Sequence, residues 1–284
     1  MCGRYVLVQK TEVLEKRFNI KVPDTLELAP NYNISIGTMA PVIASDKPNE
    51  LQLFQFGLTP FWAKKRTYFF NARAEGDRNK EDDPNYSGGK DILTKPAFRK
   101  PIRSQRCLIP CDCFIEGTTK EGLNKPFVIY LRDRRPFSLA GIWDQWTDEE
   151  TGEVVKSFAI VTTVANSLLQ MLPHHRSPVI LRESEEKTWL KSDNLHKITD
   201  LLKPYPAELM NAHPISPEIK SPKTNGKELI NPVGQRLLSE LDYNVTTHSR
   251  LQGVGTGKKP TTENPSGKVI GLSNEDIKKA TGET

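Results

Sequence analysis

Between Phe127 and Trp143 the chain reads FVIYLRDRRPFSLAGIW, two apolar runs on either side of a charged turn. Runs of β-branched and aromatic residues of this length predict strands, and similar runs cover residues 51–56 and 156–163. The strand patterns outnumber the helical ones and do not alternate with them as βαβ units would. We therefore predict an α+β fold with a mainly antiparallel β-sheet.

Turn and helix signals lie between the strand patterns. Acidic residues followed by glycine at 148–152 predict a hairpin turn between two strands. Helices are predicted at 11–18 with Thr11 as the N-cap, at 167–172 with Asn166 as the N-cap, and from Ser184 onward.

The chain has 284 residues, with 40 lysines and arginines against 35 acidic residues, and 36% of its residues are hydrophobic. This composition is typical of a globular protein. Residues 245–284 are rich in Thr, Gly, Lys and Pro and hold no aromatic residue. We therefore predict one domain at 1–244 and a disordered polar C-terminal tail at 245–284.

The sequence argues against several classes of protein. Its apolar runs are too short to span a bilayer, and its first residues lack the apolar stretch of a secretory signal. Four cysteines are too few for a secreted disulfide scaffold. We expect a cytoplasmic protein with reduced thiols and no membrane partner.

Cys2 is a candidate nucleophile. Once Met1 is removed, Cys2 carries an α-amine with a pKa of about 7.7–8 and a thiol with a pKa of about 8.5 on adjacent carbons. The pair can condense with an aldehyde and close a thiazolidine ring, or the thiolate can attack a carbonyl with the amine as its base. A frayed terminus without function is the competing interpretation.

Asn71 and Arg73 belong to the segment NARAE, which follows an aromatic run. An amide can orient a substrate hydroxyl or carbonyl, and a guanidinium can hold a phosphate. The same segment also fits a turn into a solvated helix.

Glu116 follows two apolar residues in the segment RCLIPCDCFIEG at 106–117. Apolar surroundings raise the pKa of a carboxyl group and suit it to proton transfer. An ordinary edge-strand glutamate is the alternative. The three cysteines of this segment lack the spacing of a zinc motif, so we predict buried thiols, no metal and no cofactor.

His174, His175 and Arg176 precede an apolar strand pattern at 178–181. An imidazole and a guanidinium in one turn offer an acid/base group and a phosphate ligand. Because adjacent residues of a strand point to opposite faces, we expect at most one of the two histidines to face a site. A structural role for either histidine is the alternative.

Basic residues cluster between Lys95 and Arg106, and Lys64, Lys65 and Arg66 lie between aromatic residues. Cations interleaved with aromatic rings suit single-stranded nucleic acid, because phosphates meet the cations and bases stack on the rings. A solvated surface also explains a charge run.

Taken together and in order, these segments resemble the SOS response-associated peptidase (SRAP) family, whose members shield abasic sites in single-stranded DNA. The resemblance runs from Cys2 to about residue 235. Its matching segments are Met1–Arg4, Gly57–Trp62, Asn71–Glu75, Lys95–Arg99, Arg106–Pro110, Phe114–Glu116, Ala140–Trp143, His174–Leu181, Pro214–Ser216 and Ile230–Asn231.

The resemblance implies a barrel-like core of antiparallel strands with flanking helices, and it implies roles for single residues. Cys2 would form a thiazolidine with the C1′ aldehyde of a ring-opened abasic deoxyribose, and Asn71 would orient the Cys2 end and the sugar. Glu116 would shuttle protons, and His174 would assist ring opening and any reversal. DNA contacts are implied for Arg4, Arg73, Arg176, Phe69, Phe70 and Arg99.

Five positions depart from the family pattern. Cys113 and Ile115 stand where members have Gly and Tyr. Phe56 and Gly117 stand where members have Trp, and Ser177 stands where they have Met. The loop after Glu75 is also longer. We expect the replacements at Phe56 and Ser177 to bear on base stacking, and hence on the preferred DNA structure.

Two other functions stay open. The start of the chain is also similar to class II glutamine amidotransferases, whose N-terminal cysteine makes them glutaminase-like amidohydrolases, but this leaves Glu116 and His174 unexplained. A non-catalytic single-stranded-DNA-binding module would use the basic and aromatic segments alone.

We predict an enzyme that captures abasic sites covalently through Cys2. It would have lyase- or hydrolase-type activity, autoproteolytic and peptidase-like, without general proteolysis. The implied partner is single-stranded DNA with abasic sites. A monomer is expected in the cytoplasm, at the nucleoid if the source is bacterial and in the nucleus if it is eukaryotic.

Overall fold

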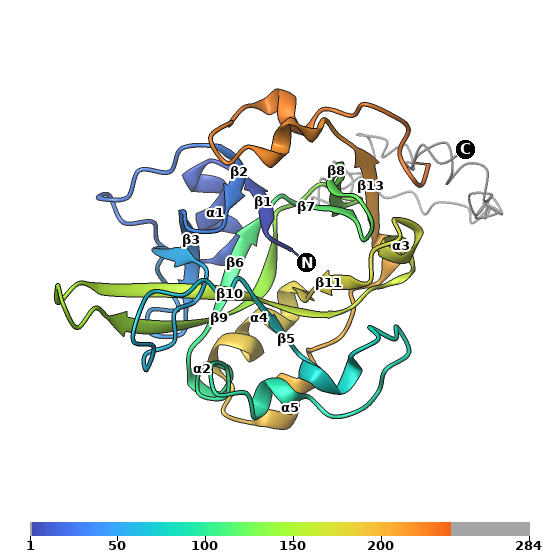
Figure 1. Cartoon of the computed structure of the whole chain (residues 1–284). Coiled ribbons are helices and arrows are strands. Elements are labelled where there is room, and N and C mark those ends of the chain that lie inside the picture. The colour runs from blue at the N-terminus through green and yellow to red at the C-terminus, as the bar shows by residue number, and fades with distance from the viewer. Residues whose placement is uncertain (1, 240–284) are drawn as a thin grey trace, which may run out of the picture.

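Five strands close into a barrel at the centre of the computed structural model, which describes residues 2–239 (Figure 1). Around the barrel, the order is β10 (Val154–Val164), β4 (Gln52–Phe56), β3 (Met39–Ala44), β6 (Arg106–Cys111) and β9 (Phe137–Thr147), which pairs again with β10. The β10–β4 pair is parallel and the other four pairs are antiparallel. The mainly antiparallel, barrel-like core is confirmed.

Three short strands extend the barrel sheet. β5 (Asn71–Arg73) lies parallel to β10, and β11 (Arg176–Pro178) pairs antiparallel with the same strand. β12 (Ile180–Leu181) pairs with β9. Because β5 and β11 both pair with the second half of β10, the segment that holds Asn71 and the segment that follows His175 lie close together in space.

The second sheet has five antiparallel strands in the order β13 (Met210–Pro214), β8 (Gly122–Leu131), β7 (Cys113–Thr118), β1 (Arg4–Leu7) and β2 (Asn31–Ser35). β7 is therefore an internal strand, flanked by β1 and β8. The charged turn at 132–136 joins β8 of this sheet to β9 of the barrel, so two adjacent strand patterns in the sequence belong to different sheets.

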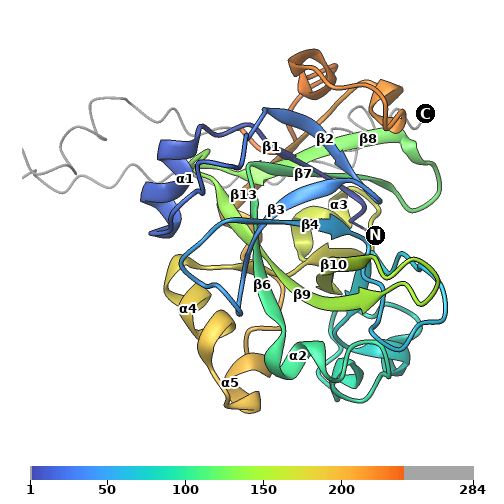
Figure 2. The same ribbon diagram turned by 90° about the vertical axis from the view of Figure 1, so that its left-hand side faces the viewer.

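The helices lie outside the sheets. They are α1 (Thr11–Phe18), α2 (Pro101–Ser104), α3 (Ser167–Met171), α4 (Glu183–Lys191) and α5 (Leu195–Thr199). Figure 2 shows α4 and α5 beside the barrel strands β6 and β9. Trp189 of α4 is fully buried there, and its indole Nε1 donates to the carbonyl oxygen of Cys107 at 3.0 Å. Short 3₁₀ helices cover Gly76–Asn79, Asp91–Leu93, Ala207–Leu209, Pro217–Lys220 and Lys227–Ile230.

The local predictions are largely confirmed. The hairpin turn at 148–152 joins β9 to β10, and the Asn166 side chain caps α3 by accepting from the backbone N–H of Leu169. The predicted starts of two helices are wrong. Lys10, not Thr11, is the N-cap of α1. α4 begins at Glu183 after Arg182, because the Glu185 carboxylate turns back to accept from the Arg182 N–H at 2.9 Å.

Part of the predicted organisation lies outside the described residues. This applies to the polar tail at 245–284 and to the domain boundary at 244. Within residues 2–239, none of the helices is long and apolar enough to cross a membrane.

Candidate active site

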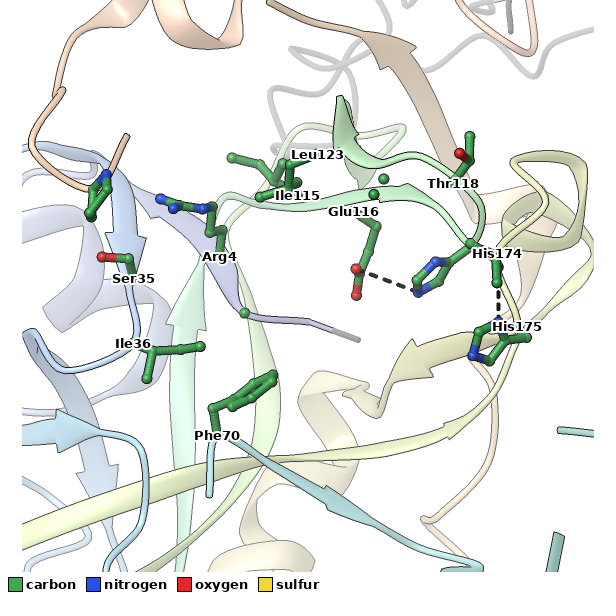
Figure 3. Close-up of a pocket in the computed structure, with 15 residues that line it drawn as sticks. Arg4, Ser35, Ile36, Phe70, Ile115, Glu116, Thr118, Leu123, His174 and His175 are labelled. Carbon is green, nitrogen blue, oxygen red and sulfur yellow. Dashed lines mark hydrogen bonds and ion pairs between the residues drawn. The ribbon is translucent and has the colours of Figure 1, made fainter. Parts of the chain in front are cut away.

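A cavity of about 550 Å³ opens beside the second sheet, at the end of the chain that holds Gly3 and Arg4. The hairpin of β7 and β8 forms one wall, and the loop before β11 closes it with His174 and His175 (Figure 3). The remaining lining residues are Ser35, Ile36, Phe70, Ile115, Glu116, Gly117, Thr118, Thr119, Gly122, Leu123 and Pro222.

Glu116 and His174 form the polar centre of this cavity. Glu116 lies on the internal strand β7, and its Oε2 is 3.4 Å from Nε2 of His174. Both side chains are about 95% buried, since their exposed fractions are 5% and 4%. The interpretation of Glu116 as an ordinary edge-strand residue is therefore wrong.

Burial determines the protonation of this pair. It raises the pKa of Glu116 from 4.5 to about 7, as the sequence led us to expect, and it lowers the pKa of His174 from 6.5 to about 3. In both cases the buried charged form is the unfavourable one. Near neutral pH the imidazole is thus uncharged, while Glu116 is divided between acid and carboxylate and can either give or take a proton.

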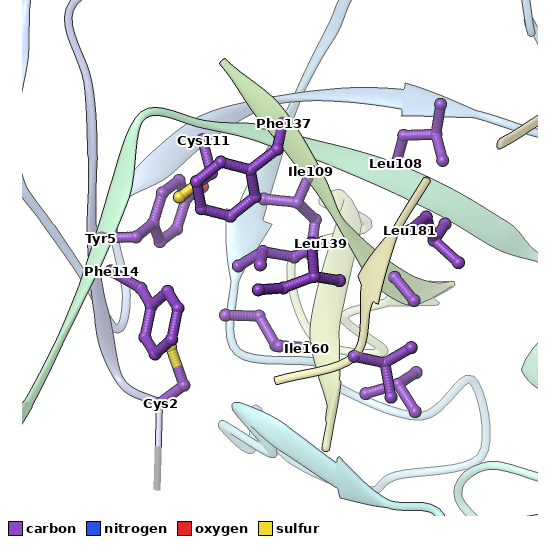
Figure 4. Packing of buried hydrophobic residues seen from close by; sticks show 14 of the residues in the cluster. Cys2, Tyr5, Leu108, Ile109, Cys111, Phe114, Phe137, Leu139, Ile160 and Leu181 are labelled. Carbon is purple, nitrogen blue, oxygen red and sulfur yellow. The ribbon is translucent and has the colours of Figure 1, made fainter. Parts of the chain in front are cut away.

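Cys2 is fully buried, and its thiol lies among apolar side chains (Figure 4). Tyr5, Cys111 and Phe114 belong to the same cluster. The Sγ atom contacts the carbonyl oxygen of Arg4 at 3.8 Å. Burial raises the pKa of the Cys2 thiol well above its ordinary value, and the nearby Glu116 carboxylate adds to this shift. The frayed-end interpretation is wrong, because this residue is packed into the core.

Asn71 connects the barrel to Cys2. Its Nδ2 donates to the carbonyl oxygen of Cys2 at 2.8 Å and to that of Phe70 at 3.0 Å. Its Oδ1 is buried and has no hydrogen-bond partner among the described residues. Asn71 lies on β5, so the alternative interpretation of this residue as part of a turn into a solvated helix is wrong. The amide therefore holds the second residue and retains one acceptor atom.

Both histidines line the cavity, which corrects the expectation that at most one would do so. They lie in the loop before β11 rather than in a strand, so their side chains need not point apart. Their rings stack with centroids 5.5 Å apart and an angle of 21° between the planes.

His175 has polar partners on both ring nitrogens. Its Nδ1 is 2.9 Å from Oγ1 of Thr119, and its Nε2 is 3.2 Å from Oδ2 of Asp82. Because Thr119 donates its own proton to the carbonyl oxygen of Pro173, its oxygen is left to accept from Nδ1. Burial lowers the pKa of His175, and the Asp82 carboxylate opposes this shift.

The residues for which the family resemblance implies DNA contacts lie in different parts of the structure. Arg4 and Phe70 line the cavity. Phe69 is 41% exposed and packs edge-on against Phe98, with ring centroids 6.0 Å apart. Arg99 is exposed but does not line the cavity.

Arg73 and Arg176 contact carboxylates. Arg176 is 1% exposed, and its Nη2 is 2.9 Å from Oε2 of the buried Glu75. This arrangement does not agree with a direct DNA contact for Arg176, because the guanidinium has no open face. Arg73 remains partly exposed, and its Nη2 is 2.6 Å from Oδ1 of Asp82. Sequence reasoning missed Asp82, which lies in the long loop after Glu75.

The departures from the family pattern concern packing. Phe56 is fully buried and stacks on Phe158 at 5.1 Å, and Ser177 is also fully buried. Neither side chain is on the surface, so neither can contact a DNA base, and the structure does not support a direct effect of these two replacements on base stacking. A Cβ on Gly117 would lie 1.9 Å from the carbonyl oxygen of Gly122, so the β7–β8 hairpin has no room for a side chain there. Cys107, Cys111 and Cys113 are free and buried, as predicted.

The fold and the site define a class: a β-barrel protein in which the second residue, a cysteine, lies beside a buried glutamate–histidine pair. The chain belongs to the family described as SOS response associated peptidase (SRAP), which matches residues 1–222.

Named relatives agree with this membership. The abasic site processing protein YoqW of Bacillus subtilis (strain 168) is 35% identical over 239 residues, which cover 81% of this chain and 99% of the relative. The abasic site processing protein YedK of Escherichia coli (strain K12) is 26% identical over 242 residues, covering 82% and 100%. The abasic site processing protein HMCES of Pongo abelii is 25% identical over 311 residues, covering 93% and 84%.

Solved structures show the same architecture. A protein from Bacteroides thetaiotaomicron superposes with a TM-score of 0.69 at 30% identity, covering 82% of this chain and 100% of that chain. A protein from Bordetella bronchiseptica has a TM-score of 0.60 at 22% identity, covering 76% and 100%, and supports the fold alone.

Proposed function

We propose that this protein captures abasic sites in DNA by forming a thiazolidine between Cys2 and the C1′ aldehyde of the ring-opened sugar. The observation that carries the proposal is the position of Cys2, held by the Asn71 amide at 2.8 Å and near enough to Glu116 for that carboxylate to raise the pKa of its thiol. The family and the names of its relatives support DNA with abasic sites as the substrate. The proposal requires removal of Met1, which gives Cys2 a free α-amine.

The order of bond formation follows from the pKa shifts. Burial keeps the Cys2 thiol protonated, so the amine is the better first nucleophile. It attacks C1′, and the resulting carbinolamine loses its hydroxyl as water when Glu116 donates a proton. The carbon of the resulting iminium then accepts the sulfur, and the thiol proton returns to the Glu116 carboxylate. One aldehyde, one amine and one thiol give one thiazolidine and one water, without an oxidant.

The surrounding residues divide the remaining tasks. Asn71 fixes the Cys2 carbonyl, and its unpaired Oδ1 can accept from the amine. Uncharged His174 can accept a hydrogen bond from the sugar hydroxyl during ring opening, while the Glu116 carboxylate, 3.4 Å away, takes the proton. Both groups work in a buried setting, which limits competing proton exchange with water.

We propose single strands as the preferred DNA. Phe61 and Trp62 are 53% and 51% exposed, and Nζ of Lys100 lies 4.4 Å from the centroid of the Phe61 ring. Exposed rings beside cations offer stacking surfaces for unpaired bases and charges for phosphates.

The test uses single-stranded DNA with one uracil, treated with uracil glycosylase, then incubated with the protein and separated on a denaturing gel. A covalent species is expected from the wild-type protein and not from Cys2→Ala. Cys113→Ala serves as the matched control, because it removes a buried thiol that has no α-amine beside it and so cannot close a thiazolidine. An equal yield from Cys2→Ala would refute the proposal, and glutamine hydrolysis by the wild-type protein would favour the amidohydrolase alternative.

A further inference from the structure

The carboxylate of Asp82 contacts three cationic or potentially cationic side chains at the edge of the cavity. Its Oδ1 lies 2.6 Å from Nη2 of Arg73 and 3.3 Å from Nη1 of Arg176, and its Oδ2 lies 3.2 Å from Nε2 of His175. Asp82 is thus the common partner of Arg73, of the buried Arg176 and of a histidine that lines the cavity.

The loop that carries Asp82 holds this carboxylate in place. Asp82 has a left-handed backbone with φ of 54°, a conformation that Asp adopts more readily than most residues. The buried Asn79 supports the turn, because its Oδ1 accepts from the Asp83 N–H at 2.9 Å and its Nδ2 donates to the Asp83 carbonyl at 3.1 Å. The Asp82 side chain is only 15% exposed, whereas the neighbouring Glu81 is exposed.

A carboxylate in this position offers what a DNA phosphate offers. Both groups carry one negative charge and present two oxygen acceptors to a guanidinium. The accessible basic side chains of the cluster are Arg73, with 29% of its side chain exposed, and His175, with 40%. A phosphate that approaches either of them meets Asp82 already bound there.

We propose that Asp82 is an internal competitor for a DNA phosphate, and that it sets the DNA affinity and salt dependence of the site. The inference rests on the proposed function, because it takes DNA as the ligand. A phosphate replaces the carboxylate on Arg73, and the loop yields Asp82 to solvent. Arg176 keeps its buried partner Glu75 in both states.

The test compares Asp82→Asn with Glu81→Gln, because both variants remove one negative charge from adjacent residues of the loop. Binding is measured by fluorescence anisotropy with single-stranded DNA containing a tetrahydrofuran abasic analogue, which cannot react with Cys2. Asp82→Asn is expected to bind roughly tenfold more tightly than Glu81→Gln, as for loss of a competing charged hydrogen bond. Freeing one phosphate site should also steepen the slope of log K against log salt by about 0.7.

A double-variant cycle separates competition from a structural effect of the loop. In a protein that already carries Arg73→Gln, Asp82→Asn should increase the DNA affinity by less than half of the factor seen without Arg73→Gln. The reason is that the arginine for which Asp82 and the phosphate compete is then absent. Equal affinities for Asp82→Asn and Glu81→Gln, weaker binding by Asp82→Asn, or a gain that persists unchanged with Arg73→Gln would each overturn the inference. If no variant binds the DNA at all, the proposed function itself fails, and that outcome is distinct because the control variant fails with the others.

Discussion

The side-chain amide of Asn71 donates to the carbonyl oxygen of Cys2 across 2.8 Å, and so joins a strand paired with the barrel to the start of the second sheet. This bond fixes the backbone directly before β1, where the proposed amine and thiol sit on adjacent carbons. The proposed chemistry needs both groups to face the same C1′ atom, so the bond bears on orientation rather than on acidity.

Asn71→Ala is expected to slow covalent capture by roughly a hundredfold, because a loss of alignment of about 1 Å can have that effect on a reacting pair. The rate is measured from the gel shift at saturating DNA. Asn225→Ala is the matched control, since the Asn225 side chain also bonds to backbone groups, Tyr32 N–H at 2.8 Å and Pro30 carbonyl at 3.2 Å, away from the cavity. Equal rates for the two variants would remove Asn71 from the mechanism.

The capture rate should show a maximum near neutral pH. The Cys2 amine must be unprotonated, and this requirement sets the acidic side of the profile, because an ordinary α-amine has a pKa of about 7.7–8. Glu116 must be protonated to release water, and its raised pKa of about 7 sets the alkaline side. Glu116→Gln should lower the rate by roughly 10²–10⁴-fold and remove the alkaline limb. A profile with an unchanged alkaline limb in this variant would assign that limb to another group.

The same carboxyl group makes a prediction about stability. Its pKa is about 7 in the folded state against 4.5 ordinarily, so between these values the folded state binds more protons than the unfolded state. The contribution of Glu116 to folding stability therefore falls as pH rises from about 4.5 to about 7. Glu116→Gln should raise the unfolding temperature relative to wild type at pH 8, and this advantage should shrink or vanish at pH 4.5.

The titration of His174 also changes the folding stability with pH, so His174 must be the same in both proteins that are compared. Its pKa is lowered to about 3, so its own contribution rises with pH from about 3 to about 6.5 and partly offsets that of Glu116. The difference between wild type and Glu116→Gln isolates the carboxyl group only if His174 is present in both proteins. An advantage of the variant that is constant from pH 4.5 to 8 would mean that the Glu116 pKa is not raised.

Local structure was predictable because it depends on nearby residues. The hairpin turn at 148–152 and the Asn166 cap follow from side chains within a few positions of the feature they form. The parallel pairing of β10 with β4 could not be predicted, since it joins Phe158 to Phe56 across about a hundred residues. The chain also passes from the second sheet to the barrel between β8 and β9, and this depends on pairing between strands that are far apart in the sequence.

The site was predictable only in part, for a similar reason. Cys2, Asn71, Glu116 and His174 were singled out by residue chemistry and their order along the chain, while their distances come from the fold. Asp82 was missed because Glu81 and Asp83 flank it with the same charge, and the backbone decides which carboxylate turns inward. The sequence predicted that at most one of His174 and His175 would face the site, because strand periodicity was applied to a segment that forms a loop.

The buried pair of Arg176 and Glu75 gives a last prediction, on folding rather than catalysis. Both side chains are 1% exposed, and Nη2 lies 2.9 Å from Oε2. Thr163 also donates to the other carboxylate oxygen, Oε1, at 2.8 Å. The pKa of Glu75 is lowered despite its burial, because the Arg176 guanidinium and these hydrogen bonds favour the charged form.

Arg176→Met should reduce the free energy of unfolding by about 3–5 kcal/mol, because it leaves the Glu75 charge buried without its cation. Glu75→Gln combined with Arg176→Met should recover much of this loss, since neither charge then remains in the interior. Urea unfolding at pH 7 measures both values. Lys47→Met is the control for an exposed pair with Glu50, for which about 0–1 kcal/mol is expected. If Arg176→Met unfolds no more easily than Lys47→Met, the arginine is not held by Glu75 in solution and is available to DNA after all.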